Sequence, residues 1–254
     1  MKRILSLTRR AIEDYDMIAE GDRIAVGVSG GKDSLTLLCA LAALRSFYPA
    51  KFELVAVLLD LGLDGAADYS QIAELCRRLN VPFYTRQTEI GEVVFHVRKE
   101  KNPCSLCANM RRGALNRLAK ELGCNKVALG HHYDDVVETF FLSLLQEGRI
   151  SCFSPVTYLS RMDLTVLRPM IYVPESVIVG FARRKNLPIY HSPCPASGHT
   201  QREETKQFIR RMSQEHDHFK EKIFGAIQRA GVGGFQETVR ARRHPVPPAQ
   251  YPDD

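Results

Sequence analysis

Two groups of residues in this sequence have the types and spacing that chemistry requires. The first follows the mostly apolar residues 23–28 and is the run Ser29-Gly30-Gly31-Lys32-Asp33-Ser34. Adjacent glycines let a backbone turn tightly and come close to a ligand. The start of a helix offers free N–H groups and a partial positive charge. If a helix begins at this turn, the run predicts a site for an anion such as pyrophosphate; a turn that only joins a strand to a helix is the alternative.

The second group consists of cysteines. Cys104 and Cys107 form a C-x-x-C pair at the predicted start of a helix, and Cys194 lies between two prolines in a segment without periodicity. Such a pair could be a redox couple, half of a zinc site or part of an iron–sulfur site. A zinc site would need His191 or His199 beside Cys194, because the chain has no second C-x-x-C. Thiolates are the preferred ligands of iron–sulfur clusters, which favours that third interpretation.

The other four cysteines have different surroundings. Cys39, Cys76 and Cys124 lie in predicted helices among apolar residues, where a free cysteine is a small core residue. Cys152 follows a less regular stretch, and the sequence leaves its role open. The sequence thus predicts that its cysteines are free thiols or metal ligands, as is typical of a cytosolic protein without disulfides.

These residues are positioned by alternating strands and helices. Short apolar runs predict strands at residues 23–28, 51–59, 82–86 and 126–130, and amphipathic or apolar patterns predict helices at about 33–47, 69–79, 103–122 and 136–146. Such alternation indicates an α/β fold with a doubly wound parallel sheet. In these sheets, ligands bind beyond the carboxyl ends of the strands. The glycine turn, Asp60 and the residues 130–135 all follow strands, so we expect them to form one active site.

The remaining segments predict additions to this core. We expect an N-terminal helix at about 3–19, a strand at 164–168, a helix at 174–185, and charged helices at about 202–214 and 216–229. The proline-rich tail from residue 244 has a composition typical of disorder. We therefore divide the chain into an N-terminal helix (1–20), a nucleotide-binding domain (21–200), C-terminal helices (201–243) and a tail (244–254).

Composition narrows the class of protein. The chain has 254 residues, 44% hydrophobic and 25% charged, which is ordinary for a folded domain. Its net charge of +6 permits a polyanionic partner. No apolar run approaches the roughly 20 residues of a membrane span, and the N-terminus lacks the core of a signal peptide. We expect a cytoplasmic protein that does not insert into membranes.

Several motifs together resemble one family, the tRNA 2-thiocytidine synthetases of the PP-loop ATP pyrophosphatase superfamily. They are Asp14-Tyr-Asp-Met-Ile18, Gly21-Asp22, Ser29-Gly-Gly-Lys-Asp-Ser34, Cys104-Ser-Leu-Cys107, Arg111-Arg112-Gly113, Leu129-Gly-His-His-Tyr-Asp-Asp135 and Arg168-Pro169. The resemblance covers about residues 3–215. It implies a Rossmann-like fold of the adenine nucleotide alpha hydrolase type, with helical extensions at both ends. The chain differs from the best-known members in having Cys194-Pro-Ala-Ser197 where they often have a second C-x-x-C, and Tyr133 where they often have arginine.

The resemblance also implies a reaction and its cofactors. ATP would adenylate the C2 carbonyl oxygen of a cytidine in the tRNA anticodon loop, position 32 in the family, and sulfur would replace it. A [4Fe–4S] cluster would be held by Cys104, Cys107 and Cys194, which leaves one iron open. Mg²⁺ would neutralise phosphate charge, held by Asp33 or Asp135. The catalytic set would thus be Asp33, Asp135 and the three cysteines.

Further site residues follow from the same resemblance. The expected nucleotide-binding residues are Ser29, Gly30, Gly31, Lys32, Asp33, Ser34, Asp60, Gly130, His131 and Asp134. Arg111 and Arg112 would contact RNA phosphates, although paired arginines on a helix are usually only solvated. Asp134 or Asp135 could equally cap a helix, and His131 and His132 could be structural.

The expected partners are tRNA and a sulfur donor such as a cysteine desulfurase, and we also consider a homodimer. Two alternatives to this reaction stay open. A PP-loop enzyme could thiolate a different base, such as a uridine in tRNA, or handle a free thio-compound. A nucleotide-binding protein with a structural zinc and no turnover is the other alternative.

Overall fold

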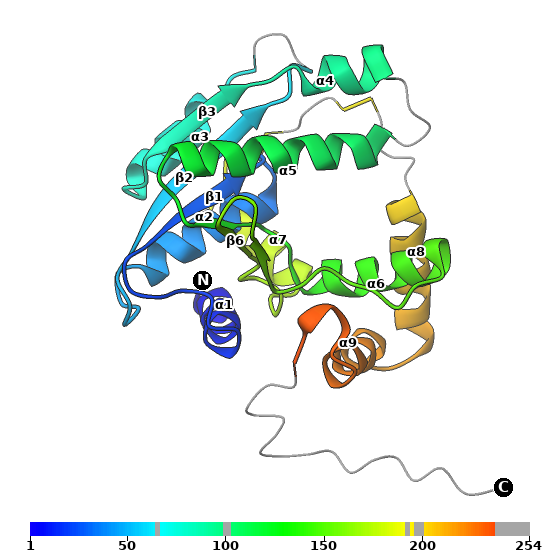
Figure 1. Cartoon of the computed structure of the whole chain (residues 1–254). Coiled ribbons are helices and arrows are strands. Elements are labelled where there is room, and N and C mark those ends of the chain that lie inside the picture. Colours follow the sequence, from blue (N-terminus) through cyan, green and yellow to red (C-terminus); the bar gives the residue numbers. More distant parts are fainter. Residues whose placement is uncertain (64–66, 99–102, 191–193, 196–200, 237–254) are drawn as a thin grey trace, which may run out of the picture.

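The apolar runs of the sequence form the centre of a mostly parallel sheet. The computed structural model describes residues 1–63, 67–98, 103–190, 194–195 and 201–236 of the chain. The sheet has six strands in the order β3-β2-β1-β4-β6-β5 (Figure 1). The strands are β1 (Asp22–Val28), β2 (Phe52–Asp60), β3 (Phe83–Gln87), β4 (Lys126–Ala128), β5 (Val156–Leu159) and β6 (Leu164–Leu167). Only β5 runs antiparallel to its neighbour, β6, among these strands.

Side chains that alternate along β1 and β2 face two different hydrophobic cores. Ile24, Val26 and Val28 belong to the larger core, whereas Ala25 and Val55 belong to the smaller one. A strand that is apolar on both faces must be covered on both faces, which explains why these strands read as nearly continuous apolar runs. The sheet is therefore doubly wound, as the sequence predicts.

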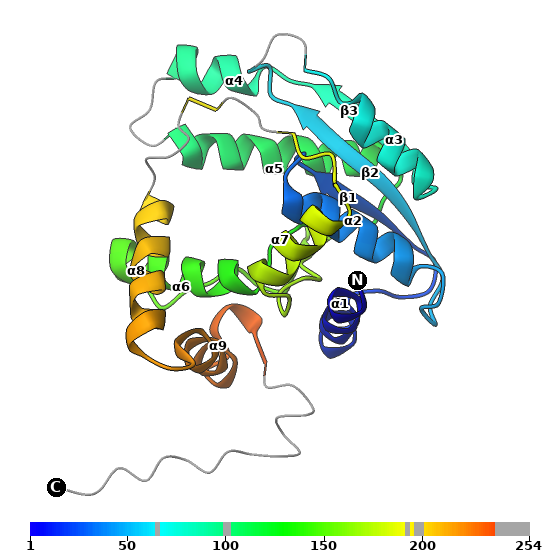
Figure 2. The same ribbon diagram turned by 180° about the vertical axis from the view of Figure 1, so that it is seen from behind.

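Helices cover each face of the sheet. The larger core lies beneath α1 (Lys2–Asp14), α2 (Lys32–Leu44), α3 (Ser70–Arg78) and α7 (Glu175–Arg184). The smaller core lies beneath α5 (Pro103–Glu121), which runs across the other face. Figure 2, seen from behind, shows α2 and α7 on the face opposite to α5. Between β3 and α5 the chain forms a single helical turn, α4 (Ile90–Glu92), and a π-helical segment, Val93–Arg98.

Three further helices pack together beside the sheet. They are α6 (Tyr133–Glu147), α8 (Gln201–Glu215) and α9 (Phe219–Arg229), followed by a 3-10 turn, Val232–Gly234 (Figure 1). Aromatic rings join them, because Phe141 of α6 lies 5.4 Å from Phe208 and 5.7 Å from Phe219, between ring centroids. Phe235 is fully buried against this group. The C-terminal helices are thus attached to the domain through α6.

Most predicted elements are confirmed, but residues 90–98, to which the sequence assigned no element, form α4 and the π-helical segment, and two further elements differ. The N-terminal helix ends at Asp14 and not near residue 19, because Asp16 takes a left-handed conformation (φ 46°) and the Met17 N–H bonds back to the Ile12 carbonyl. Strand β5 was not predicted by the pattern. The tail 244–254 and the histidines His191 and His199 lie outside the described residues, and the domain boundaries stay predictions. None of the helices in the described part of the chain combines the length and apolarity that a membrane crossing requires.

Candidate active site

The glycine turn sits between β1 and α2, as its sequence predicts. Gly30 has φ 79°, and a Cβ there would come within 2.9 Å of the Tyr190 Cβ, so only glycine fits. The Ser29 N–H donates to the Ser34 hydroxyl, which donates to the Gly31 carbonyl. No described side chain caps α2, whose N-cap residue is Gly31. The first N–H groups of this helix therefore remain available to an anion.

The loop after β4 touches this turn. Because β1 and β4 are adjacent parallel strands, their carboxyl ends open at the same point of the sheet. A Cβ on Gly130 would lie 3.0 Å from the Ser34 amide nitrogen and 3.1 Å from the Asp33 carbonyl carbon. The absence of a side chain at Gly130 thus allows the two loops to meet.

The lysine of the turn is held by two carboxylates. The Lys32 ammonium lies 3.0 Å from Asp33 Oδ2 and 2.9 Å from Glu175 Oε1, at the first residue of α7. Burial lowers the pKa of Lys32, but the hydrogen bonds with Glu175 and Asp33 outweigh it and raise that pKa above its ordinary value. The side chain is therefore charged, and its ammonium lies between the first turns of α2 and α7.

His132 lies between the two aspartates that were predicted to bind Mg²⁺. Its Nε2 is 3.7 Å from Asp33 Oδ1 and 3.5 Å from Asp135 Oδ2. Asp33 Oδ1 is buried and has no hydrogen-bond partner among the described residues. His132 is also the N-cap of α6, and forms a capping box with Asp135. Of the two aspartates that the sequence offered as helix caps, Asp135 is therefore the one in the capping box. The Asp135 carboxylate nevertheless faces Asp33 across the imidazole of His132.

Asp134 points elsewhere. Its two oxygens accept hydrogen bonds from the Glu175 N–H, at 2.7 Å, and from the Lys220 ammonium of α9, at 2.6 Å. Burial alone would raise the pKa of Asp134, but these bonds lower it below its ordinary value. The structure places this carboxylate in the packing of α6, α7 and α9, and away from the pocket described next.

A pocket of about 850 Å³ opens beyond the carboxyl ends of the strands. The predicted site residues that line it are Ser29, Asp60, Cys107, Arg111, Arg112, His131 and Cys194. Of the glycine turn, only Ser29 belongs to this lining. The other predicted site residues that the structure describes lie outside it, and they are Gly30, Gly31, Lys32, Asp33, Ser34, Gly130, Asp134, Asp135 and Cys104. Asp60 Oδ1 accepts a hydrogen bond from the Gly62 N–H, so this carboxylate also shapes the loop after β2.

The three predicted cluster ligands are neighbours. Burial raises the pKa of the Cys107 thiol, and the charges of Cys194 and Cys104 raise it further, against a lowering effect of Arg111. In the described part of the chain, no three His, Cys, Asp or Glu side chains converge closely enough to hold a single metal ion. The thiols thus share one region at the start of α5 without meeting at a point.

The four remaining cysteines lie apart from this region. Cys39, Cys76 and Cys124 are buried, and burial raises the pKa of Cys39 and of Cys76 to about 11. Cys152 is half-buried, and its thiol donates to the Val136 carbonyl, with its pKa raised by burial to about 12. These thiols are protonated at neutral pH, as expected for core residues.

The wall of the pocket contains residues that sequence reasoning did not assign. Arg168, Phe153 and Tyr190 line it, and so does Arg202 of α8, which lies 3.5 Å from Asp135. Burial lowers the pKa of His131 to about 4, and the charge of Arg168 adds to this effect, so the imidazole is neutral. Arg168 belongs to the Arg168-Pro169 motif, which could have drawn attention to it. Phe153, Tyr190 and Arg202 lie in segments where the sequence shows no motif.

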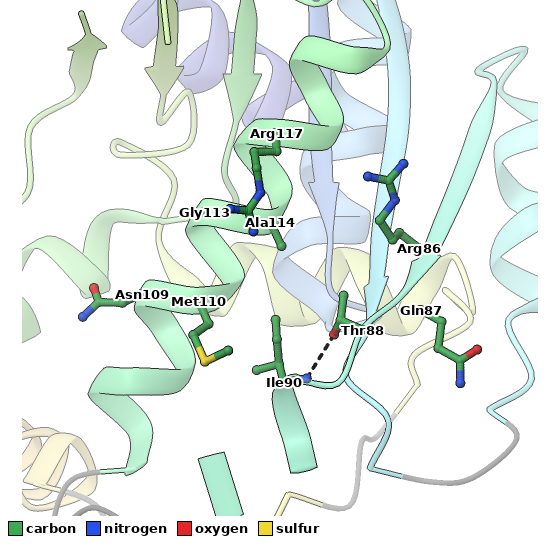
Figure 3. A pocket seen from close by; sticks show the side chains of 9 residues that line it. All are labelled: Arg86, Gln87, Thr88, Ile90, Asn109, Met110, Gly113, Ala114 and Arg117. Atoms are coloured by element: carbon green, nitrogen blue, oxygen red, sulfur yellow. Dashed lines mark hydrogen bonds between the residues drawn. The ribbon is translucent and has the colours of Figure 1, made fainter. Parts of the chain in front are cut away.

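A second pocket, of about 570 Å³, lies along another face of α5 (Figure 3). Its lining residues come from the end of β3, from α4 and from α5, and are Arg86, Gln87, Thr88, Ile90, Asn109, Met110, Gly113, Ala114 and Arg117. None of the predicted site residues is among them. Of these two pockets, only the first is therefore lined by predicted site residues.

Comparisons with known proteins agree with this geometry. The PP-loop domain family matches residues 4–212. The chain is 38% identical over 229 residues to the tRNA-cytidine(32) 2-sulfurtransferase of Geobacter sulfurreducens, covering 89% of each chain. It is 41% identical over 232 residues to the protein of that name from Alkalilimnicola ehrlichii, covering 89% of this chain and 73% of the relative.

Among solved structures, the fold is similar to that of the U34-tRNA thiolase NcsA from Methanococcus maripaludis with its [4Fe-4S] cluster. The TM-score is 0.71 at 24% identity, covering 89% of this chain and 77% of the other. This likeness supports the fold, while the curated relatives identify the family. The chain belongs to the PP-loop family and, within it, to the family of tRNA-cytidine(32) 2-sulfurtransferases.

Proposed function

We propose that this protein is an ATP-dependent, [4Fe–4S]-dependent tRNA sulfurtransferase that makes 2-thiocytidine at position 32 of the anticodon loop. The reaction is the one named for its curated relatives. The observation that carries the proposal is the composition of the larger pocket, where Ser29 of the glycine turn lies in the same lining as Cys107 and Cys194. Activation by ATP and sulfur transfer need these two groups in one chamber.

The glycine turn is suited to the phosphates of ATP. Its uncapped helix start and the Lys32 ammonium present positive charge to an anion. Glu175 holds the Lys32 ammonium at this place. A bound phosphate would share this ammonium with Glu175. Asp60 lies on the β2 side of the pocket, where we place the nucleoside. Attack of the cytidine O2 on the α-phosphorus would form the O2–phosphorus bond and release pyrophosphate.

Asp33 and Asp135 are suited to a magnesium ion. Their carboxylates approach the same imidazole nitrogen, and the buried Asp33 Oδ1 lacks a hydrogen-bond partner among the described residues. Carboxylate oxygens are the ligands that Mg²⁺ prefers, and it typically takes one or two of them together with substrate phosphates. When bound, the ion would neutralise the charge of the leaving pyrophosphate.

The cysteines fit an iron–sulfur cluster better than a zinc ion. Thiolates are the preferred ligands of iron–sulfur clusters, whereas a zinc site would also need His191 or His199, which lie outside the described residues. Cluster ligands bind different irons, so the three thiols need only surround a common volume. We propose Cys104, Cys107 and Cys194 as these ligands, with Arg111 favouring the thiolate of Cys107. The cluster would supply the sulfur that displaces AMP from C2.

The partners follow from this reaction. The second substrate is tRNA, and the proposed sulfur donor is a cysteine desulfurase. We propose that the protein acts in the cytoplasm, where both occur. A homodimer remains part of the proposal, to be tested by the mass of the protein in solution.

Replacing each proposed ligand with alanine tests the assignment. Anaerobically purified Cys104→Ala, Cys107→Ala and Cys194→Ala should lose iron and sulfide and the absorbance of the cluster, while an ATP analogue still binds. tRNA from a strain that lacks the gene should lack 2-thiocytidine, and the wild-type gene should restore it, whereas the genes for the three ligand variants should not. Cys124→Ala, in the smaller core, serves as the control that keeps both cluster and product.

Three results would contradict the proposal. One zinc per chain in place of iron would support the nucleotide-binding alternative with a structural metal. An intact cluster in Cys194→Ala would exclude this residue as a ligand. Loss of a thiolated uridine, with 2-thiocytidine retained in the deletion strain, would keep the enzyme class but change its substrate.

A further inference from the structure

Arg168 is a buried cation without a carboxylate partner among the described residues. It follows β6 and is 8% exposed. Its Nη1 donates to the Ser154 carbonyl at 2.5 Å and to the Thr157 hydroxyl at 3.3 Å. Its guanidinium carbon lies 5.1 Å from the centre of the Phe153 ring. Its Nε is buried and has no hydrogen-bond partner in the described part of the chain.

A second arginine adds to this charge. Burial, with the charge of Arg112 adding to its effect, lowers the pKa of Arg168 to about 10. Arg112 itself donates to the Asn109 side-chain carbonyl, a neutral group. Two nearby guanidinium groups without an intervening acid destabilise each other, and burying an unpaired cation costs free energy. An anion bound between them would relieve both costs, and Arg forms bidentate hydrogen bonds to phosphate.

The position of these arginines indicates which anion is expected. Both line the larger pocket, and Arg168 stands on the β6 side of β4, whereas the glycine turn follows β1 on its other side. The proposed function places the phosphates of ATP at the turn. Beside Arg168, the rings of Phe153 and the neutral His131 lie 4.9 Å apart and form an apolar wall. Cations beside aromatic rings are typical of sites for unpaired nucleotides.

We propose that Arg168 and Arg112 form a phosphate-binding subsite that holds a backbone phosphate of the RNA strand entering the pocket. Phe153 and His131 provide the wall beside the nucleotide. The subsite would fix the strand relative to the glycine turn before ATP reacts. The identity of the strand as tRNA rests on the proposed function.

The test compares Arg168→Gln, Arg168→Lys and wild type in binding a short RNA stem-loop over a series of salt concentrations. Loss of one phosphate contact should weaken RNA binding and make the plot of log K against log salt concentration shallower by about one unit. Arg168→Lys keeps the positive charge but cannot form the bidentate hydrogen bonds of a guanidinium. Its RNA affinity should therefore fall, while the slope of its salt dependence stays at the wild-type value. Binding of a non-hydrolysable ATP analogue without RNA should be unchanged in both variants.

The matched control is Arg23→Gln. Arg23 also has a buried Nε without a described hydrogen-bond partner, but its Nη1 pairs with Glu53, and it lies at the amino end of β1, away from the pocket at the carboxyl ends of the strands. The Arg23→Gln variant should have the same RNA affinity as wild type and the same slope of log K against log salt concentration. Thermal unfolding of every variant shows whether a change comes from loss of the fold.

Three outcomes would overturn the subsite. Equal RNA affinity and slope in Arg168→Gln and wild type would show that no phosphate binds there. Weaker binding of the ATP analogue, with RNA binding unchanged, would assign the phosphate to the nucleotide. If Arg168→Gln does not fold, a lower melting temperature in Arg168→Lys with wild-type RNA affinity would leave Arg168 only a structural role. A wild type that binds RNA through Arg168 but forms no 2-thiocytidine would contradict the proposed function alone.

Discussion

Replacing Gly130 with alanine tests the contact between the two loops that form the nucleotide site. The added Cβ would lie 3.0 Å from the Ser34 nitrogen, 3.1 Å from the Asp33 carbonyl carbon and 3.2 Å from the Asp33 carbonyl oxygen. All three are backbone atoms of the first turn of α2, so no side-chain rotation can relieve the overlap. On the other side, the capping box of His132 and Asp135 holds the loop. The loops must therefore separate by a few tenths of an ångström.

The expected magnitude follows from overpacking. Inserting a methyl group into a tightly packed place costs about 1–3 kcal/mol. If the turn moves away to relieve this strain, ATP binds less tightly, and each 1.4 kcal/mol raises the dissociation constant about tenfold. The dissociation constant should rise by about 5-fold to about 140-fold. Calorimetric titration with a non-hydrolysable ATP analogue and Mg²⁺ measures it, and thermal unfolding reports any part of the strain borne by the fold.

Gly113→Ala is the matched control. A Cβ at Gly113 meets nothing within 4 Å, and the residue lies within α5. Alanine in a helix interior is favoured over glycine by roughly 0.5–1 kcal/mol, so this variant should be at least as stable as wild type and bind ATP equally. Wild-type ATP affinity together with a wild-type melting temperature in Gly130→Ala would refute the close approach of the two loops.

Two further substitutions separate the neighbouring acidic groups. Asp33→Ala should keep the fold but abolish the formation of AMP and pyrophosphate at saturating Mg²⁺, measured by chromatography; retained cleavage would exclude the proposed metal role. Asp134→Asn should lower the free energy of unfolding by about 2 kcal/mol, since it weakens the bonds to Lys220 and the Glu175 N–H and Lys220 is partly exposed. Because the pKa of Asp134 is lowered from 3.8, wild type loses this stabilisation as pH falls through the folded pKa, so urea unfolding should show the difference narrowing there; a constant difference would contradict the assignment.

The strands and the glycine turn could be predicted because their signals are local. A run such as residues 23–28, apolar at nearly every position, is itself the requirement for a strand covered on both faces. Strand β5 was missed, because a strand of four residues carries little pattern and its pairing with β6 depends on the tertiary fold. The end of α1 was missed for a similar reason, since the left-handed Asp16 interrupts an apolar spacing that continues beyond it.

Contacts between distant segments limited the prediction of the site. The sequence indicates that Lys32 could meet a phosphate, but not that Glu175 of α7 holds its ammonium. Likewise, Arg168 belongs to the Arg-Pro motif, but the sequence does not show that it is buried without an acidic partner among the described residues. Charge compensation is a property of neighbours in space, and these neighbours come from different helices and strands.

The aspartates Asp134 and Asp135 show the same limit most directly. They are adjacent and chemically identical, but successive residues at a helix start point in different directions. Asp135 therefore faces His132 and Arg202 of α8, while Asp134 faces Lys220 of α9. The C-terminal helices, which the sequence places outside the nucleotide-binding domain, thus supply the cations that hold both carboxylates. The arrangement of the acidic groups beside the glycine turn consequently depends on α8 and α9 as well as on the sheet.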